Sequence, residues 1–204
     1  AAGEVIQNQA ALIKELVENS LDAKATKITI SLENFGLTKI SIEDNGVGIR
    51  KEELPLAPHR HATSKISTFD DLYSISTMGF RGEALASIFS VAQVELISKT
   101  ESQEYAYKIT NENYSPIKCA GENGTSVVVT NLFYNTPARL KYLRSNRYEL
   151  KEIVETVKAI SIIHPQLDIS LIHNSKELFR KVQYPTFKQN ISQTLQIQQQ
   201  DKFF

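Results

Sequence analysis

Three polar side chains fall on one face of an expected helix near the start of the chain. Apolar residues recur at helical spacing between residues 4 and 23, which predicts an amphipathic helix. At about 100° per residue, Glu15, Asn19 and Asp22 lie opposite that apolar stripe. An amide oxygen together with phosphate oxygens suffices to hold Mg²⁺, and a carboxylate one turn away can act as a general base on water. The alternative is an ordinary solvated helix face.

Two glycine-containing segments could approach a ligand closely. The first, "DNGVG" at residues 44–48, follows an expected strand; an aspartate there can accept a hydrogen bond from an exocyclic amine such as that of adenine. A hairpin turn is the alternative, because Asn-Gly is a strong turn signal. The second, "TMGFRGEAL" at residues 77–85, precedes an expected helix, whose first N–H groups can point at phosphates. An ordinary glycine-containing loop is equally compatible with it. The P-loop pattern GxxxxGK[ST] does not occur in the sequence.

Two further segments carry hydroxyl groups and cations. Residues 60–65, "RHATSK", form an expected loop that could close over a polyphosphate, with a solvated loop as the alternative. Thr125 opens the expected strand "GTSVVV", and its hydroxyl could support a buried aspartate, although a plain strand start is as good an interpretation. His59 and His61 have no cysteine or carboxylate at ligand spacing, so the sequence predicts no zinc site.

Composition indicates a folded domain in a reducing compartment. The chain has 204 residues, enough for one domain or for one domain plus part of another. Lys plus Arg and Asp plus Glu are both 23, so net charge does not indicate a nucleic-acid partner. Cys119 is the single cysteine, which excludes a disulfide within the chain. No apolar run approaches the roughly 20 residues of a spanning helix, and no signal peptide is apparent, so no membrane partner is expected. The first residue is not Met and the chain stops abruptly at "DKFF", which suggests a fragment.

The pattern of expected elements favours an α+β fold. Alternation predicts a hairpin from residues 26–33 and 38–44, and helical periodicity predicts a long helix at 146–163. Further expected elements are a short helix at 51–57, a loop at 58–79, a helix at 82–89, strands at 92–100, 104–110 and 125–132, and a closing hairpin at 167–173 and 177–184. Strict strand–helix alternation is missing, so we expect a mixed, mostly antiparallel sheet covered by helices.

The order and spacing of these motifs resemble one known family. The stretches "AAGEV", "KELVENSLDA", "DNGVGI", "RHATSK", "GFRGEALASI", "GTSVVV" and "LFYNTPARLKYL" together closely resemble the MutL family of DNA mismatch-repair proteins, particularly its bacterial members. The resemblance covers residues 1–185 and implies a two-layer α/β sandwich of the Bergerat (GHKL) ATPase type, with helices on one face. Residues 186–204 would then be a linker or the start of a truncated second, transducer-like domain.

The resemblance implies an ATP site, which carries over position by position. Glu15 matches the general base and Asn19 the magnesium ligand. The remaining nucleotide-binding positions are Ala23, Asp44 with Thr125 supporting it, Gly48, a lid of Thr63, Ser64 and Lys65, and a phosphate loop with its helix start at Gly79, Phe80, Arg81, Gly82, Glu83, Ala84 and Leu85.

The family's activity follows as an expectation. The resemblance implies that Mg-ATP is bound and slowly hydrolysed, and that ATP drives N-terminal dimerisation into a DNA clamp. The clamp recruits a mismatch-recognition protein and downstream repair enzymes, in the cytoplasm or in a eukaryotic nucleus. Hydrolysis by this fragment is expected to be weak, because relatives use a lysine from a second domain. The alternatives are a nucleotide-gated binding module with negligible turnover, or another Bergerat ATPase such as a topoisomerase B-type subunit or a sensor kinase. A sensor kinase, however, has no reason to keep a hydrolytic glutamate.

A basic segment follows "NTPA". Arg139, Lys141, Arg144 and Arg147 occur with no acidic residue between positions 139 and 148. Such clusters attract DNA phosphates without reading sequence. A solvated segment leading into the next helix is the alternative interpretation.

Overall fold

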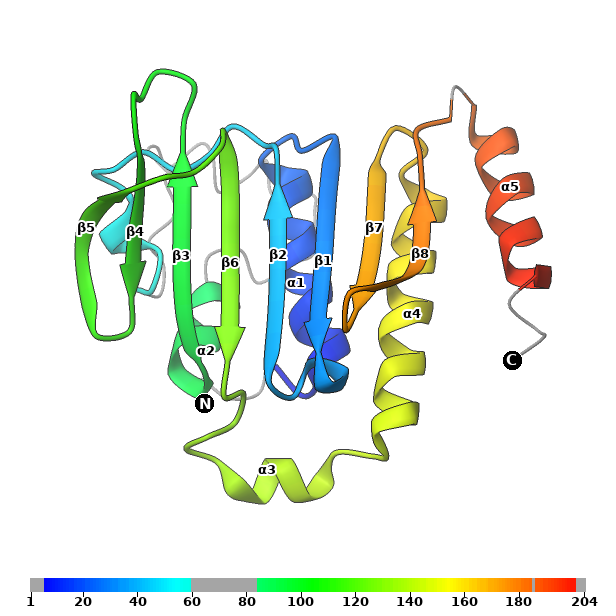
Figure 1. Cartoon of the computed structure of the whole chain (residues 1–204), viewed down its shortest axis with the longest axis horizontal. Helices are drawn as coiled ribbons and strands as arrows, with labels where there is room; N and C mark the ends of the chain where they lie inside the picture. Colours follow the sequence, from blue (N-terminus) through cyan, green and yellow to red (C-terminus); the bar gives the residue numbers. More distant parts are fainter. Residues whose placement is uncertain (1–5, 60–83, 185, 201–204) are drawn as a thin grey trace, which may run out of the picture.

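One eight-stranded sheet, with helices packed behind one of its faces, forms the body of the molecule (Figure 1). The computed structural model describes residues 6–59, 84–184 and 186–200. The strand order is β5-β4-β3-β6-β2-β1-β7-β8. The strands are β1 Lys27–Glu33, β2 Lys39–Asp44, β3 Gln93–Lys99, β4 Ala106–Thr110, β5 Asn113–Cys119, β6 Gly124–Thr130, β7 Asp168–His173 and β8 Lys176–Lys181. Among these strands, β1 and β7 pair in parallel and the other neighbours pair antiparallel, so the predicted mixed sheet is confirmed.

Strict alternation in β1 and β2 creates the two faces of the sheet. Ile28, Ile30 and Leu32 are buried, whereas the residues between them are half-buried. Ile30 lies opposite Ile42 of β2 in the antiparallel register, so both point into the same helix-covered core. The predicted hairpin is therefore confirmed, with the short 3₁₀ turn η1 (Asn34–Gly36) at its tip.

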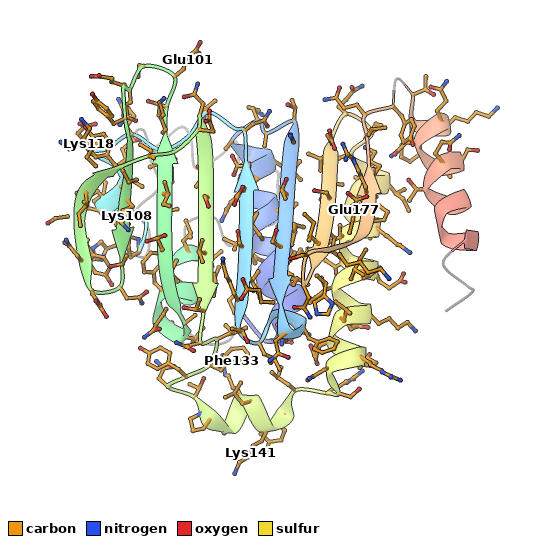
Figure 2. All side chains as sticks on the ribbon, in the orientation of Figure 1. Glu101, Lys108, Lys118, Phe133, Lys141 and Glu177 are labelled. Carbon is orange, nitrogen blue, oxygen red and sulfur yellow. The ribbon has the colours of Figure 1, made fainter. Side chains whose placement is uncertain are left out.

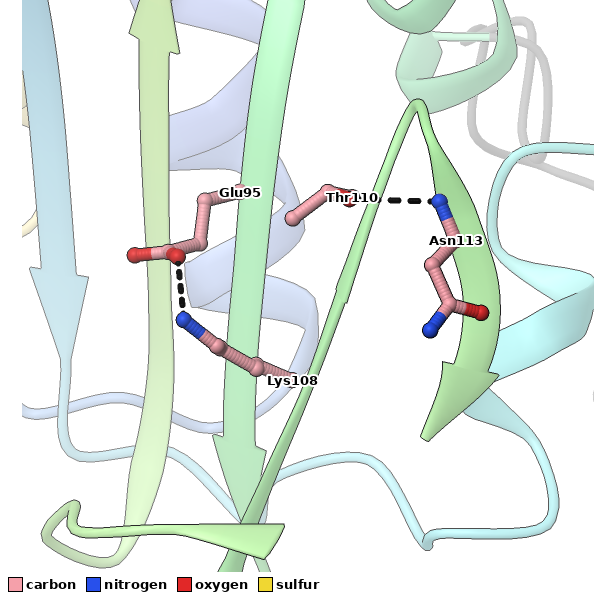
Figure 3. Close-up of polar contacts among 4 residues, drawn as sticks. All are labelled: Glu95, Lys108, Thr110 and Asn113. Carbon is pink, nitrogen blue, oxygen red and sulfur yellow. Dashed lines mark hydrogen bonds and ion pairs between the residues drawn. The ribbon is translucent and has the colours of Figure 1, made fainter. Parts of the chain in front are cut away.

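The strands β3, β4 and β5 form a meander at one edge of the sheet (Figure 3). Lys108 Nζ and Glu95 Oε2 form an ion pair of 2.9 Å across β3 and β4. At the turn into β5, the backbone N–H of Asn113 donates to Thr110 Oγ1 at 3.3 Å. Strand β5 was not predicted. None of its residues is buried, so it lacks the alternation that reveals a half-buried strand.

Helices α1 (Gln9–Asp22), α2 (Ala84–Val91) and α4 (Asn146–Ile163) lie behind the sheet (Figure 1). Helix α4 has the predicted bounds and follows its cap residue Ser145. Helix α1 begins at Gln9, later than predicted, because Asn8 is extended and its side chain accepts a hydrogen bond from the Ala11 amide at 2.8 Å. The expected helix at 51–57 is reduced to the 3₁₀ turn η2 (Leu54–Leu56).

Two helices were not predicted. Helix α3 (Pro137–Tyr142) joins β6 to α4 beyond the end of the sheet, and it has no buried residue. Helix α5 (Phe187–Gln200) contacts α4, where Asn190 Nδ2 donates to the carbonyls of Ser161 and Ile162 at 2.9 and 2.7 Å. The helix falls in the segment predicted as a linker or second domain, and that division stays a prediction. None of the described helices is long and apolar enough to cross a membrane.

Candidate functional site

Asp44 stands at the end of β2 on the helix-covered face of the sheet. Its Cα is paired with that of Thr125 in β6, which is paired in turn with Ser98 in β3, so three polar side chains form one row across adjacent strands. Asp44 Oδ2 accepts a hydrogen bond of 2.7 Å from the Ser20 hydroxyl, and Oδ1 accepts one of 2.8 Å from the Gly46 amide. Each oxygen has a second lone pair, so this fixed carboxylate can still accept from a ligand.

The turn after Asp44 packs against the end of α1. The Val47 amide donates to the Ala23 carbonyl at 2.9 Å, and a Cβ at Gly46 would lie only 2.7 Å from that same oxygen. Asn45 Oδ1 accepts from the amides of Thr26 and Lys27 at 2.9 and 2.8 Å. Ala23 and the "DNG" turn are thus held against each other as one rigid unit.

Gly48 is required by its backbone conformation. Its φ is +73°, and a Cβ there would lie 2.3 Å from the Lys99 carbonyl oxygen. A side chain cannot be accommodated at that distance, so the backbone geometry alone accounts for the glycine, and a ligand at this position stays a prediction.

The Thr125 hydroxyl has a different partner from the one expected. It lies 2.9 Å from Ser98 Oγ, which itself accepts from the Ile49 amide and donates to the Gly124 carbonyl, both at 2.8 Å. Because the Ser98 proton is used on Gly124, Thr125 is the donor of the pair. The hydroxyl that donates to Asp44 among the described residues is that of Ser20, and a supporting role for Thr125 stays a prediction.

Sequence reasoning missed Ser20, although a signal for it exists. Ser20 follows Leu16 and Val17 by four and three residues, which places it within the apolar stripe of α1. It is 3% exposed. A serine on the buried side of a helix needs a hydrogen-bond partner, and it could have been matched to a nearby strand-end carboxylate.

The acidic face of α1 carries a carboxylate suited to accept a proton. Glu15 is half-buried; burial, and next the charge of Glu18, raise its pKa above the ordinary value for a glutamate. A raised pKa makes a carboxylate a stronger base. Asn19 and Asp22, farther along the same face, are exposed. The described residues contain no group of three or more His, Cys, Asp or Glu that could hold a metal ion.

Several predicted site residues lie outside the described residues. They are Thr63, Ser64, Lys65, Gly79, Phe80, Arg81, Gly82 and Glu83. The last two predicted positions, Ala84 and Leu85, open α2, where Ala84 is buried and Leu85 packs partly buried against the core.

The basic segment is divided by the structure into engaged and free side chains. Arg139 Nη1 donates to the Ile6 carbonyl at 3.2 Å, and the Arg144 guanidinium lies 4.2 Å from the centre of the Tyr148 ring. Lys141 and Arg147 are exposed, and Figure 2 shows Lys141 pointing from α3 away from the sheet. Arg144 is exposed as well and Arg139 is half-buried, and contact of these four residues with DNA stays a prediction.

Comparison with known proteins identifies the architecture. A model of the family described as "Histidine kinase-, DNA gyrase B-, and HSP90-like ATPase" matches residues 7–120. A crystal structure described as the N-terminal domain of a DNA repair protein aligns with a TM-score of 0.76 and 30% identity, covering 94% of this chain and 58% of that one. The Aquifex aeolicus MutL ATPase domain complexed with ADP aligns with a TM-score of 0.72 and 27% identity, covering 94% of this chain and 70% of that one.

Similar proteins bear the name DNA mismatch repair protein MutL. That of Mannheimia succiniciproducens is 52% identical over 182 residues, covering 87% of this chain and 29% of the relative. That of Histophilus somni is 47% identical over 195 residues, covering 94% of this chain and 32% of the relative. The chain spans about a third of the length of these curated relatives. The chain belongs to the family of histidine kinase-, DNA gyrase B- and HSP90-like ATPases, and within it to the MutL family.

Proposed function

We propose that this domain binds ATP at the end of β2 and hydrolyses it slowly as part of DNA mismatch repair. The observation that carries the proposal is the Asp44 carboxylate, held by Ser20 and by the Gly46 amide with a lone pair left on each oxygen. Such an acceptor suits the exocyclic amine of adenine. Its position at the end of α1 leaves the acidic face of that helix for the phosphates.

The adenine end of the proposed site is rigid. Ala23 would line it, and its position is fixed by the hydrogen bond of 2.9 Å that its carbonyl accepts from the Val47 amide. Thr125 would take part through its hydroxyl, which is positioned by Ser98 at 2.9 Å rather than by Asp44. Gly48, which has no side chain, lets the backbone pass close to the Lys99 carbonyl. Preorganised contacts of this kind reduce the ordering that binding requires.

The phosphate end of the proposed site would use the polar face of α1. A magnesium ion arriving with phosphates needs only one or two protein oxygens, so the exposed amide of Asn19 fits this role without a carboxylate cluster. When bound, the ion would neutralise phosphate charge. Glu15, four residues earlier and half-buried, would take the proton from the attacking water.

The remaining proposed contacts come from the family resemblance. Thr63, Ser64 and Lys65 would cover the nucleotide, and Gly79, Phe80, Arg81, Gly82 and Glu83 would surround the phosphates ahead of Ala84 and Leu85 at the start of α2. The ADP complex of the similar Aquifex aeolicus domain supports adenine-nucleotide binding in this fold.

In the whole protein, we propose that ATP binding closes an N-terminal dimer around DNA, in the bacterial cytoplasm. The dimer would recruit a mismatch-recognition protein and downstream repair enzymes, and hydrolysis would reopen it. Exposed Lys141 and Arg147 are the proposed DNA contacts on this chain, with exposed Arg144 and half-buried Arg139 adding positive charge to the same segment. Turnover by this chain alone would be weak, and residues 186–204 would lead into a second domain.

Ligand discrimination tests the proposal on the unmodified chain. In the presence of Mg²⁺, ATP at about 100 times its Kd should raise the free energy of unfolding by about 2.7 kcal/mol. Thermal unfolding with GTP at the same concentration should show little change, because guanine presents a carbonyl where adenine presents the amine that Asp44 accepts. Equal stabilisation by GTP, or none by either nucleotide, would contradict the proposed site.

A further inference from the structure

Ser98 is a buried serine near the end of β3, one strand away from the residues of the proposed adenine site. It lies opposite Thr125 of β6 in the strand register, and Thr125 lies opposite Asp44 of β2. Asp44 and Thr125 are half-buried, so both retain accessible surface, whereas Ser98 is only 1% exposed. Any influence of Ser98 on a ligand must therefore pass through its neighbour Thr125.

The hydrogen bonds of the Ser98 hydroxyl are all made within the protein. Its oxygen accepts from the Ile49 amide at 2.8 Å, and its proton is donated to the Gly124 carbonyl at 2.8 Å. The same oxygen lies 2.9 Å from Thr125 Oγ1. A hydroxyl has one proton and two lone pairs, so Ser98 can meet Thr125 only as an acceptor. The proton in that contact is the one that Thr125 carries.

This arrangement fixes the hydrogen-bonding polarity of Thr125. Its single hydroxyl proton is directed at Ser98, so toward a ligand the Thr125 oxygen offers a lone pair and no donor. The neighbouring Asp44 carboxylate also acts as an acceptor, taking protein donors from Ser20 and Gly46. Two acceptors thus stand side by side on adjacent strands.

Adjacent acceptors select a ligand by the donors that it brings. An exocyclic amine offers N–H groups to them, whereas a carbonyl in the same place would set lone pair against lone pair. A site that leaves its partly desolvated polar groups unpaired rejects the wrong ligand more strongly than one hydrogen bond rewards the right one. The polarity of Thr125 therefore bears directly on which base can bind.

We propose that Ser98 is a positioning residue that sets the base specificity of the nucleotide site. By accepting the Thr125 proton, it keeps Thr125 an acceptor and makes the site choose a base with an amine over one with a carbonyl. The inference rests on the proposed binding of adenine at Asp44. It adds a specificity-determining residue on β3 that does not itself touch the nucleotide.

Comparison of two nucleotides tests this role. Inosine triphosphate carries a carbonyl where ATP carries the amine, and calorimetric titration with Mg²⁺ gives the Kd of each. Ser98→Ala frees the Thr125 proton, which can then be donated to the carbonyl of inosine triphosphate. The preference for ATP, measured as the ratio of the two Kd values, should therefore fall about fivefold, the size of one neutral hydrogen bond.

A conservative variant separates this role from a structural one. Ser98→Thr keeps the hydroxyl and should keep the preference for ATP shown by the unmodified chain. A serine that only stabilises the fold would weaken both nucleotides equally when replaced, and the ratio would not move. An unchanged ratio in Ser98→Ala, or the same fall in Ser98→Thr, would overturn the proposal.

A second pair of variants tests the polarity of Thr125 and decides the question if Ser98→Ala does not fold. Thr125→Val removes an acceptor, so ATP should bind about fivefold more weakly, whereas inosine triphosphate should lose nothing because Thr125 had no proton to give. Thr125→Ser, which keeps the hydroxyl, should bind both nucleotides like the unmodified chain. Weaker binding of inosine triphosphate to Thr125→Val would show that Thr125 donates to the ligand, which contradicts the proposal.

The unmodified chain distinguishes failure of this inference from failure of the proposed function. If it binds ATP and inosine triphosphate equally, or binds neither, recognition of adenine at Asp44 is wrong and the role of Ser98 falls with it. If it prefers ATP and Ser98→Ala retains that preference in full, the proposed function stands and the Ser98 assignment alone is overturned.

Discussion

The Ser20 hydroxyl donates a 2.7 Å hydrogen bond to Asp44 Oδ2, which ties the last turn of α1 to the end of β2. Ser20 is buried, and its oxygen also lies 3.2 Å from the Leu16 carbonyl of its own helix. The shorter contact reaches a carboxylate, and hydrogen bonds to charged groups are the stronger kind. One buried serine thus orients the residue on which the proposed adenine recognition depends.

Replacing this serine should affect both stability and binding. Ser20→Ala should lower the free energy of unfolding by about 1–2 kcal/mol, because the half-buried Asp44 carboxylate loses a donor. ATP affinity should fall several-fold, since Asp44 keeps only the Gly46 amide to orient it. Urea unfolding and calorimetric titration measure the two effects. Ser31→Ala, in a half-buried position of β1, is the control, and an equal effect there would contradict the role of Ser20.

The proposed general base should show itself in turnover without loss of binding. Glu15→Gln should reduce ATP hydrolysis by about 10²-fold or more while ATP still binds, as is typical when a general base is lost. Phosphate release and nucleotide titration measure the two quantities. If Glu15→Gln hydrolyses ATP like the unmodified chain, Glu15 is not the general base. A chain that binds ATP and shows no turnover before mutation would instead favour a nucleotide-gated binding module.

The pH dependence of turnover provides a separate check on Glu15. Burial and the Glu18 charge raise the Glu15 pKa, so the base becomes active only as pH rises through that raised pKa. Glu18→Gln removes one cause and should shift the rise in turnover to lower pH. The folded state also binds the extra proton, so Glu15 makes the fold less stable as pH rises through the same range. A turnover profile unchanged by Glu18→Gln would contradict this electrostatic coupling.

A buried lysine donates hydrogen bonds to backbone carbonyls at the C-terminal end of α4. Lys181 Nζ donates to the carbonyls of His164, Pro165 and Leu167 at 2.7, 2.9 and 2.7 Å. Burial lowers the pKa of Lys181 to about 8. The unfolded chain, with an ordinary lysine pKa of about 10.4, therefore binds more protons between these values, and the free energy of unfolding should rise with pH across that window.

Replacing Lys181 should lower the stability of the fold and remove the pH dependence of the free energy of unfolding. Lys181→Met leaves the three carbonyls without their donor, so the free energy of unfolding should fall by about 2 kcal/mol or more at neutral pH. The rise between about pH 8 and pH 10.4 should also disappear from denaturant titrations. Lys188→Met, at an exposed position of α5, should retain that rise. The same slope in both variants would show that Lys181 is not its source.

The elements that could be predicted from sequence are those with one buried face. Helix α4 places Ile153 and Val157 in the core at helical spacing, and β1 alternates Ile28, Ile30 and Leu32 with less buried residues. Both patterns arise from burial on one side, which is the property that periodicity measures. The hairpin of β1 and β2 also needed only local sequence, since a short turn joins them.

The elements that escaped prediction lack such a face or depend on distant partners. Strand β5 and helix α3 have no buried residue, so neither leaves a periodic signal. The parallel pairing of β1 with β7 joins segments more than a hundred residues apart. At the site, Asp44 could be chosen from its place after a strand, but its partner Ser20 depends on how α1 crosses the sheet.

The proposed DNA contacts should be visible in salt dependence. Lys141→Gln combined with Arg147→Gln should lower the slope of log affinity against log salt by about 0.9 per lost phosphate contact, or roughly 1.8 in total. Both side chains are exposed, so stability should hardly change. Fluorescence anisotropy of a labelled duplex measures the slope. Lys118→Gln, in the distant strand β5, is the control, and an unchanged slope in the double variant would remove these residues from the DNA contact.

The central claim, that Asp44 recognises adenine, is tested most directly by calorimetric titration of Mg-ATP into two neighbouring variants. Both oxygens of Asp44 accept protein hydrogen bonds. Asp44→Asn therefore loses the negative charge and places its NH₂ group opposite the donor of either Ser20 or Gly46. A lost hydrogen bond to a charged group costs about 1.5–3 kcal/mol, so affinity should fall roughly tenfold to a hundredfold. Glu43→Gln, exposed on the opposite face of β2, should bind like the unmodified chain. If both variants bind normally, or both lose affinity equally, Asp44 is not the adenine acceptor and the proposed site is wrong.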